Sequence, residues 1–174
     1  MKVQVPGYMQ LRPIVDGDHE WLIELHNDPA VLRNVTHPQP ITLQQHLAWW
    51  EGIRANQSQL RMIFEVNGER AGLTKFYDLD FDNNCCVLGG DIHKDQRGNG
   101  YAKLMWALML NKCFDEFYFN RVALSTAEFN AVARHVYQGL GFKYEGQLTQ
   151  GIYRDGQYYD LVLMYMLRDD WSSP

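Results

Sequence analysis

The sequence has 174 residues, of which 46% are apolar and 21% charged, with 16 basic against 21 acidic side chains. This balance is typical of a globular chain and unlike that of a disordered one, and the length suits one domain with its own core. The net charge of −5 gives no basic footprint for nucleic acid. No run approaches the roughly 20 apolar residues of a membrane helix, and the first residues carry no apolar leader, so we expect a cytoplasmic protein that binds neither nucleic acid nor membrane.

The cysteines and histidines form no metal-binding pattern. Cys85, Cys86 and Cys113 are odd in number, two of them are adjacent, and none stands at a metal-ligand spacing. The six histidines are scattered along the chain. We therefore expect reduced cysteines at core or strand positions and no structural metal.

The first part of the chain predicts a strand over 9–14 and a helix over 19–27, which ends before Asp28-Pro29. Two prolines within 31–41 predict a loop. Thr42, with Gln45 three residues later, matches a capping box and predicts the start of a second helix.

The rest of the chain alternates strand and helix patterns around clear turn signals. Asn67-Gly68 and Asp155-Gly156 are hairpin turn signals, and Gly141 is expected to end a helix. We predict strands over 60–66, 71–79, 85–93, 120–125, 143–150 and 158–167, and helices over 101–117 and 130–140. This order predicts an α/β (α+β) fold, with a mixed sheet flanked by helices.

A glycine-rich segment, Asp95 to Ala102, joins a predicted strand to the long helix. Glycines there let the main chain approach an anion, and a helix N-terminus offers free N–H groups and a positive dipole end. Arg97 adds a cation. The segment therefore suits a phosphate, although an ordinary strand-to-helix turn has the same composition; it matches neither a P-loop nor a dinucleotide fingerprint.

A second candidate pair, Asn130 and Tyr137, lies on one predicted helix. Seven residues are nearly two turns, so both side chains share a face about 10 Å apart along the axis. The alternative roles are a helix N-cap for Asn130 and a core aromatic for Tyr137.

These two segments together resemble the GNAT superfamily of N-acetyltransferases. R-G-N-G-Y-A, from Arg97 to Ala102, resembles its acyl-CoA signature R/Q-x-x-G-x-G/A. N-A-V-A-R-H-V-Y-Q-G-L-G-F, from Asn130 to Phe142, resembles its N-x-x-[AS]-x-x-x-Y-x-x-x-G-F element. The ending, Gly146 to Leu167, is similar to the RimJ/RimL and spermidine acetyltransferase branch, and the start is also like the nucleotide amino-sugar acetyltransferases.

The resemblance implies a single GNAT domain over 1–174, with about six to seven strands and about four helices. It implies acetyl-CoA as cosubstrate and Tyr137 as the general acid that protonates the leaving thiolate. The residues implied to bind the cofactor are Ile92, His93, Arg97, Gly98, Asn99, Gly100, Tyr101, Ala102 and Asn130. Gly89-Gly90 suits a bulge or a close main-chain approach beside them.

The base that deprotonates the amine is not given by the resemblance. Histone-type members carry a Glu early in the strand before the loop, whereas the comparable positions here, 84–86, are Asn, Cys and Cys. Asp91 and Glu65 are the two candidates to relay a proton through water. Asp91 is our first candidate, with a structural pairing to Arg97 or Lys94 as its alternative role. An ordered water without a single essential base is a further alternative.

The acceptor is expected to be a nucleotide-linked amino sugar, a protein N-terminus, or a polyamine or other small amine. Its site is expected to include Trp49, Trp50, Glu65, Phe76 and Tyr77. A non-catalytic acyl-CoA-binding module is the alternative function. The Tyr-rich final hairpin is a candidate homodimer surface.

Overall fold

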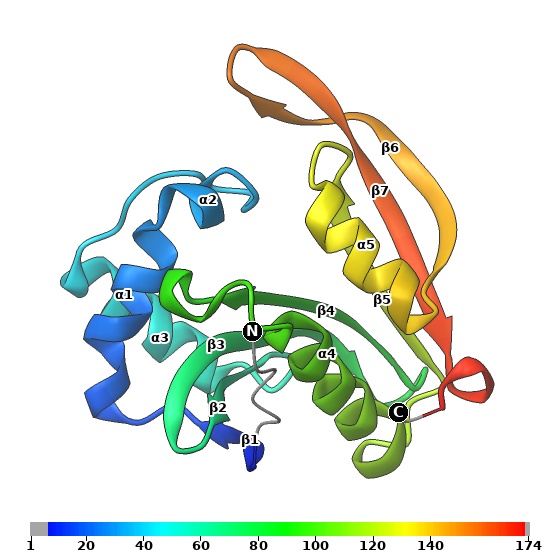
Figure 1. The fold of residues 1–174 in the computed structure, drawn as a ribbon, viewed down its shortest axis with the longest axis horizontal. Helices are drawn as coiled ribbons and strands as arrows, with labels where there is room; N and C mark the ends of the chain where they lie inside the picture. The colour runs from blue at the N-terminus through cyan, green and yellow to red at the C-terminus, as the bar shows by residue number, and fades with distance from the viewer. Residues whose placement is uncertain (1–6, 173–174) are drawn as a thin grey trace.

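The computed structural model describes residues 7–172, whose strands form one seven-stranded sheet (Figure 1). The order across the sheet is β1-β2-β3-β4-β5-β7-β6, and every neighbouring pair is antiparallel except β4 and β5. The strands are β1 (Met9–Pro13), β2 (Leu60–Val66), β3 (Glu69–Asp80), β4 (Cys85–Ile92), β5 (Arg121–Ala127), β6 (Lys143–Arg154) and β7 (Gln157–Leu167). The mixed sheet with flanking helices confirms the predicted fold class.

The α-helices within residues 7–172 are α1 (His19–Asn27), α2 (Pro29–Leu32), α3 (Leu43–Ala55), α4 (Tyr101–Asn111) and α5 (Ala131–Leu140). A π-helical turn, Lys112–Glu116, continues α4, and short 3-10 turns occupy Asp16–Asp18, Lys94–Gln96 and Arg168–Asp170. No helix in this part of the chain is long and apolar enough to cross a membrane.

Each face of the sheet has its own apolar core. On one face, α1 and α2 bury Leu22, Leu25 and Val31 against β2 and β3. On the other face, α4 and α5 contribute to a larger core that includes Met105 and Tyr137. Side chains alternate along a strand, so Ile63 of β2 packs with the α1 core and its neighbour Phe64 with the α4 core.

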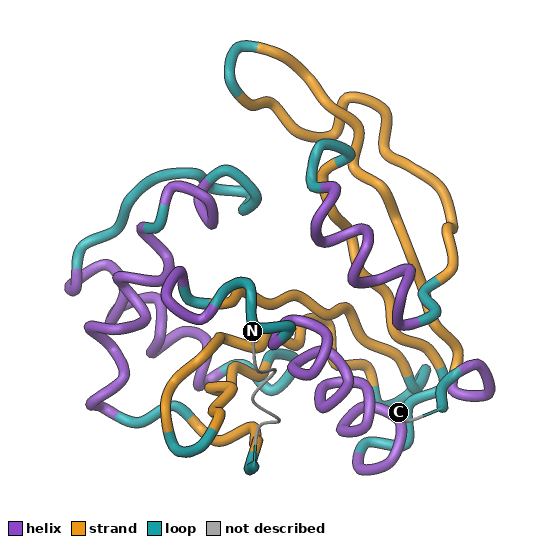
Figure 2. Tube along the Cα trace, in the orientation of Figure 1, coloured by secondary structure: helices purple, strands orange, loops and turns teal. Residues whose placement is uncertain are grey.

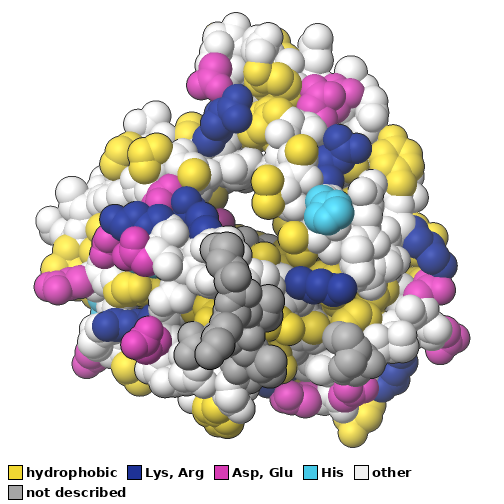
Figure 3. Space-filling view, viewed as in Figure 1, with side chains coloured by type: hydrophobic (Ala, Val, Ile, Leu, Met, Phe, Trp, Pro, Cys, Tyr) yellow, Lys and Arg dark blue, Asp and Glu magenta, His cyan; other side chains and the backbone are white. Residues whose placement is uncertain are grey.

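Strands β4 and β5 separate soon after they begin. They pair in parallel only between Cys85–Val87 and Arg121–Ala123. Beyond these residues β4 runs toward α1, while β5, β7 and β6 turn away from it (Figures 1 and 2). The space-filling view shows an opening between these two halves of the molecule (Figure 3). The β5-facing edge of β4 beyond Val87 therefore has main-chain groups free of strand pairing.

Most predicted elements are confirmed, and their ends follow identifiable local chemistry. Helix α1 has the predicted bounds, and Thr42 and Gln45 form the predicted capping box of α3. Gly141 closes α5 in the left-handed conformation, with φ +98°. Asn67-Gly68 and Asp155-Gly156 both have positive φ, as turns that join antiparallel strands require.

Several local predictions differ from the structure, and β6 extends to Arg154 where the sequence predicts its end at 150. The α-helical part of 101–117 ends at Asn111, because the chain changes to π-helical pairing. The predicted loop begins with α2, since Asp28 caps a helical turn that has Pro29 at its first position. Of the two features predicted at Gly89-Gly90, the bulge is absent, because the register of β4 with β3 is regular there, and the close approach is found at Gly90. A Cβ at Gly90 would lie 2.7 Å from Met105 Cε, so this glycine lets α4 pack closely on the sheet.

Candidate active site

The loop before α4 has the conformation and the open space that an anion requires. Gly98 and Gly100 have φ of +81° and +76°, which glycine adopts without strain. Gly100 is the N-cap and provides no side-chain hydrogen bond to the helix. A Cβ added at either glycine would meet nothing within 4 Å. The first N–H groups of α4, at Tyr101 and Ala102, therefore suit a phosphate group of a cofactor.

Arg97 is held by protein groups on this loop. Its Nε donates to the main-chain oxygen of Ile92 at 3.1 Å, and its Nη1 lies 3.3 Å from Asp28 Oδ2. Partial burial opposes the charge of Asp28, but the N–H of Ala30 and the Arg97 guanidinium outweigh it and lower the pKa of Asp28. Arg97 thus ties the loop to α2, while Asn99 closes the loop through Gln96.

The side chains of Ile92 and His93 belong to the protein interior. Ile92 packs against the larger core. The His93 ring is buried and stacks on Trp21, with 5.2 Å between ring centroids. Its main-chain N–H donates to Ala71 at 2.9 Å. Contacts from these two residues to a cofactor are therefore left to main-chain groups at the free edge of β4.

Asn130 stands at the start of α5, and Tyr137 lies on the buried side of this helix. Asn130 Oδ1 accepts from the N–H of Ala133, so this side chain is the helix N-cap. Tyr137 is 8% exposed and lies edge-on to Trp106, with 4.6 Å between centroids. Within residues 7–172 its hydroxyl makes no hydrogen bond, which leaves it available to a ligand. Burial raises the pKa of Tyr137, and the negative charge of Asp91 adds to this effect. The phenol is therefore protonated at neutral pH.

Asp91 forms an ion pair with Lys75 of β3 instead of Arg97 or Lys94. The two charged atoms are 2.5 Å apart, and both side chains are largely buried. Burial opposes the charge on Lys75, but the Asp91 carboxylate outweighs it and raises the pKa of Lys75. Lys75 is therefore protonated at neutral pH and holds the Asp91 side chain in place at the edge of β4.

A cavity of about 700 Å³ lies between this ion pair and the helices on the α1 side of the sheet. The floor is formed by β2, β3 and β4, and the remaining walls by α1, α3 and the segment 35–41. Its charged and polar wall residues are His26, Thr36, His37, Gln39, Gln45, His46, Gln59, Arg61, Lys75, Tyr77 and Asp91.

The final hairpin holds the segment that covers this cavity. Arg154 at the end of β6 is largely buried, and its Nε donates to the main-chain oxygen of Arg33 at 3.0 Å. Its Nη2 donates to the main-chain oxygen of Val35. Arg33 in turn pairs with Asp155 at 3.0 Å.

Of the residues predicted on the acceptor side, Trp49 and Tyr77 line the cavity, and Trp50, Glu65 and Phe76 do not. Phe76 is fully buried beside Phe117, because it alternates with Tyr77 along β3 and faces the α4 side. Trp50 borders a second, smaller hollow.

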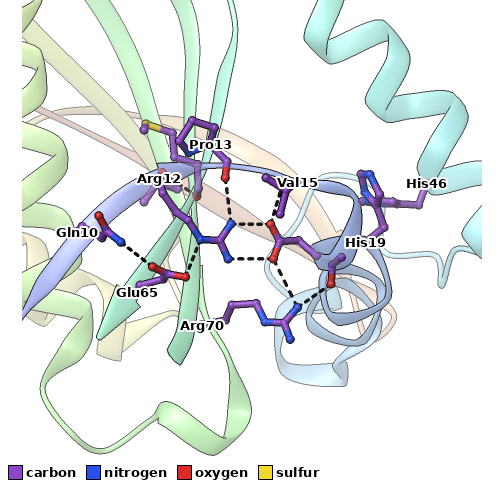
Figure 4. Close-up of polar contacts among 12 residues, drawn as sticks. Gln10, Arg12, Pro13, Val15, His19, His46, Glu65 and Arg70 are labelled. Carbon is purple, nitrogen blue, oxygen red and sulfur yellow. Dashed lines mark hydrogen bonds and ion pairs between the residues drawn. The ribbon is translucent and has the colours of Figure 1, made fainter. Parts of the chain in front are cut away.

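Glu65 belongs to an ion-pair cluster next to the 3-10 turn that precedes α1 (Figure 4). Its carboxylate accepts from Arg12 Nε at 2.6 Å and from Gln10. The other edge of the Arg12 guanidinium binds Asp18, which also lies 3.4 Å from Arg70. The Glu65 side chain thus joins β1, β2 and the 3-10 turn before α1, away from the cavity.

Sequence reasoning missed Arg61, Lys75 and the histidines of the cavity. Arg61 and Lys75 are charged residues inside the apolar strand segments L-R-M-I-F and L-T-K-F-Y. A charged residue within an apolar strand is the sequence pattern that indicates a buried charge at these positions. His46 Nε2 lies 3.0 Å from Nδ1 of the buried His19. Burial and the neighbouring His19 lower the pKa of His46 to about 4, so this side chain is neutral at pH 7.

Comparison with known proteins identifies the family. The family model described as "Acetyltransferase (GNAT) domain" matches residues 9–143. The chain belongs to the GNAT acetyltransferase family. It is 30% identical over 124 residues to the putative ribosomal N-acetyltransferase YdaF of Bacillus subtilis, covering 71% of this chain and 68% of that protein. It is 24% identical over 166 residues to the spermidine N(1)-acetyltransferase of Escherichia coli K12, covering 95% of this chain and 89% of that protein.

The GNAT fold is also seen among solved structures. The Vibrio cholerae spermidine N-acetyltransferase, in complex with CoA and spermine, matches with a TM-score of 0.88 and 21% identity, covering 93% of this chain and 96% of that one. The protein is therefore a GNAT N-acetyltransferase, which uses acetyl-CoA to acetylate an amine. The glycine loop at α4, with its open space and uncapped N–H groups, fits the phosphates of this cosubstrate.

Proposed function

We propose that the protein acetylates a small primary amine bound in the cavity over β2–β4, by direct attack in a ternary complex. The early separation of β4 and β5 carries this proposal. It opens a path between two sites on opposite sides of β4: the glycine loop at α4, and the cavity bordered by Asp91. In this arrangement the thioester of acetyl-CoA supplies the acetyl group.

Tyr137 and Asp91 have complementary roles in the proposed reaction. A bond forms between the amine nitrogen and the acetyl carbon, and the bond from that carbon to sulfur breaks. The protonated Tyr137 hydroxyl donates to the departing sulfur, as its free hydroxyl and raised pKa support. The Asp91 carboxylate, held by Lys75, accepts a proton from the amine through water, so the nitrogen attacks as a neutral amine.

The cover over the cavity favours a small acceptor over a protein N-terminus. Val35, Thr36 and His37 line the cavity, and Arg154 holds the main chain just before and within this segment. A polypeptide would need this cover displaced, whereas a small amine fits within about 700 Å³.

The test is to titrate CoA by calorimetry and to follow free thiol release from acetyl-CoA with a panel of small amines and a peptide N-terminus. We expect CoA binding and amine-dependent thiol release with a small amine. Tight CoA binding without turnover on any amine would instead support an acyl-CoA-binding module, and turnover on the peptide alone would exclude the small acceptor.

A further inference from the structure

We propose that the acceptor carries an anionic group, a carboxylate or a phosphate, which binds to Arg61 in the cavity. This inference rests on the proposed function and specifies the chemistry of its acceptor. It starts from the one strand residue of the cavity whose charge is not balanced by a neighbour within the described residues.

Arg61 is a buried cation with an unused donor. The residue is 4% exposed, yet it lines the cavity. Its Nη1 donates to the main-chain oxygens of Leu60 and Phe76, and its Nη2 donates to Gln59 Oε1 at 2.7 Å. Its Nε has no hydrogen-bond partner among residues 7–172. A buried guanidinium without an acidic partner is costly, because neutral oxygens replace only part of its hydration.

The cavity offers this cation no carboxylate of its own. Asp91 is the sole acidic residue among the described lining residues, and it is paired with Lys75 at 2.5 Å. With His46 neutral at pH 7, the charged strand residues Arg61, Lys75 and Asp91 give the cavity floor an excess of one positive charge. An anionic group on the substrate would neutralise the charge of Arg61.

Aromatic rings orient the guanidinium. Its central carbon lies 4.2 Å from the centroid of the Tyr77 ring and 6.0 Å from that of Trp49. Both rings line the cavity, so they restrict the plane of the guanidinium without supplying a negative charge. A preformed fork of this kind suits a planar carboxylate or a phosphate oxygen pair.

The same charges disfavour a polyamine. A polyamine keeps one or more cationic nitrogens after its reacting amine has lost a proton, and each would need an acidic partner. The described lining residues offer only the neutralised Asp91, beside two fixed cations. An amine with an anionic group instead meets Arg61 with opposite charge and leaves its nitrogen for the Asp91 side of the cavity.

The experiment compares matched acceptors that differ only in the anionic group. Thiol release is measured with L-methionine against L-methioninamide, with glucosamine 6-phosphate against glucosamine, and with spermidine. We expect the anionic member of at least one pair to have the higher kcat/KM by about 10- to 100-fold, as a charged hydrogen bond provides. The first pair reports a carboxylate and the second a phosphate.

Variants of Arg61 then show whether this residue causes the preference for an anionic acceptor. Arg61→Gln should lower kcat/KM for the anionic member more than for the neutral member, by that same factor, and leave CoA affinity unchanged. Arg61→Lys should restore part of this difference. Arg54→Gln is the matched control, since Arg54 is exposed and pairs with Glu51 outside the cavity. If Arg61→Gln does not fold, the comparison of matched acceptors with the wild-type protein still tests whether the acceptor carries an anionic group.

Three results would overturn the inference while leaving amine acetylation intact. They are equal or better kcat/KM for the neutral members, the highest kcat/KM for spermidine, and an equal loss for both members of a pair in Arg61→Gln. Absence of thiol release with every amine, by contrast, would contradict the proposed function itself.

Discussion

Tyr137 is buried where a phenol cannot ionise easily, and its hydroxyl is left without a hydrogen bond among residues 7–172. A core tyrosine usually pairs its hydroxyl, since an unpaired buried polar group is costly. We therefore expect Tyr137→Phe to lower kcat about 100-fold and to leave CoA affinity unchanged, because only proton donation to sulfur is lost. Steady-state rates and a CoA titration measure the two effects separately.

The control for this variant is Tyr118→Phe, since Tyr118 is 67% exposed. The Tyr118→Phe variant should change neither kcat nor the affinity for CoA. Unchanged kcat in Tyr137→Phe would remove this residue from the mechanism. Because the pKa of Tyr137 is raised, the wild-type rate should also show no loss up to about pH 10, the ordinary pKa of tyrosine.

Individual residues also show which parts of the site could be predicted from sequence. The glycine loop and Tyr137 each lie in a motif of contiguous residues, so the sequence alone shows the pattern. Arg61 and Lys75 acquire their meaning only when β2, β3 and β4 pair and bring Asp91 beside Lys75. Phe76 and Tyr77 are both expected on the acceptor side, but strand register, not composition, decides which of two neighbours faces the cavity, and only Tyr77 does.

Packing between elements depends on glycine at one contact of α4 with β4. A Cβ at Gly90 would lie 2.7 Å from Met105 Cε and 3.2 Å from the Leu73 main-chain oxygen. We predict that Gly90→Ala lowers the free energy of unfolding by about 1 kcal/mol, the low end of overpacking costs, because the Met105 methyl can shift and the fixed neighbour is the Leu73 oxygen. Gly89→Ala, whose nearest contact is the Tyr77 ring at 3.3 Å, is the control and should cost less. Equal costs in urea unfolding would contradict this account of α4 packing.

The contact between the β6–β7 hairpin and the segment after α2 should control access to the cavity. Arg154→Ala removes the hydrogen bonds to the main-chain oxygens of Arg33 and Val35. We expect KM for the amine to rise about 10-fold, consistent with the loss of one or two such bonds, and CoA affinity to stay constant. Amide hydrogen exchange of residues 33–37 should become faster.

Arg134→Ala is the matched control for the hairpin contact, because Arg134 is a surface arginine that donates to the main-chain oxygen of Glu128. It should leave KM and exchange unchanged. An unchanged amine KM in Arg154→Ala would mean that this contact serves stability alone.

Elements with strong local signals could be predicted closely, whereas their continuation could not. The capping box and the two positive-φ turns follow from a few adjacent residues. The end of α4 depends on a change to π-helical pairing, and the extension of β6 to Arg154 depends on β7 and the segment after α2. Long-range partners of this kind leave no local pattern.

For the whole molecule, the cluster of Arg12, Asp18 and Glu65 predicts acid-sensitive stability. Burial opposes the charge of both carboxylates, but hydrogen bonds from Arg12 and other groups outweigh it and lower the pKa of Asp18 and of Glu65. The folded protein thus binds protons here more weakly than the unfolded chain does. The stabilisation is complete above the unfolded pKa values of 3.8 and 4.5 and is lost as pH falls through the folded ones.

Asp18→Asn should therefore lower the free energy of unfolding by about 2 kcal/mol at pH 7, and by less at pH 3. Urea unfolding at both pH values checks this expectation. Asp82→Asn, at an exposed turn, is the control. A loss that is equal at both pH values would show that charge on Asp18 is not the source of stability.

The central claim is that acetyl-CoA and the amine are bound together, on opposite sides of β4, when the acetyl group moves. Initial rates measured while both concentrations are varied test it most directly, with the best amine of the panel as acceptor. A ternary complex predicts double-reciprocal lines that intersect, and no thiol release from acetyl-CoA when the amine is absent. Parallel lines, with a burst of one thiol per protein before amine is added, would show a covalent acetyl-enzyme and contradict the account.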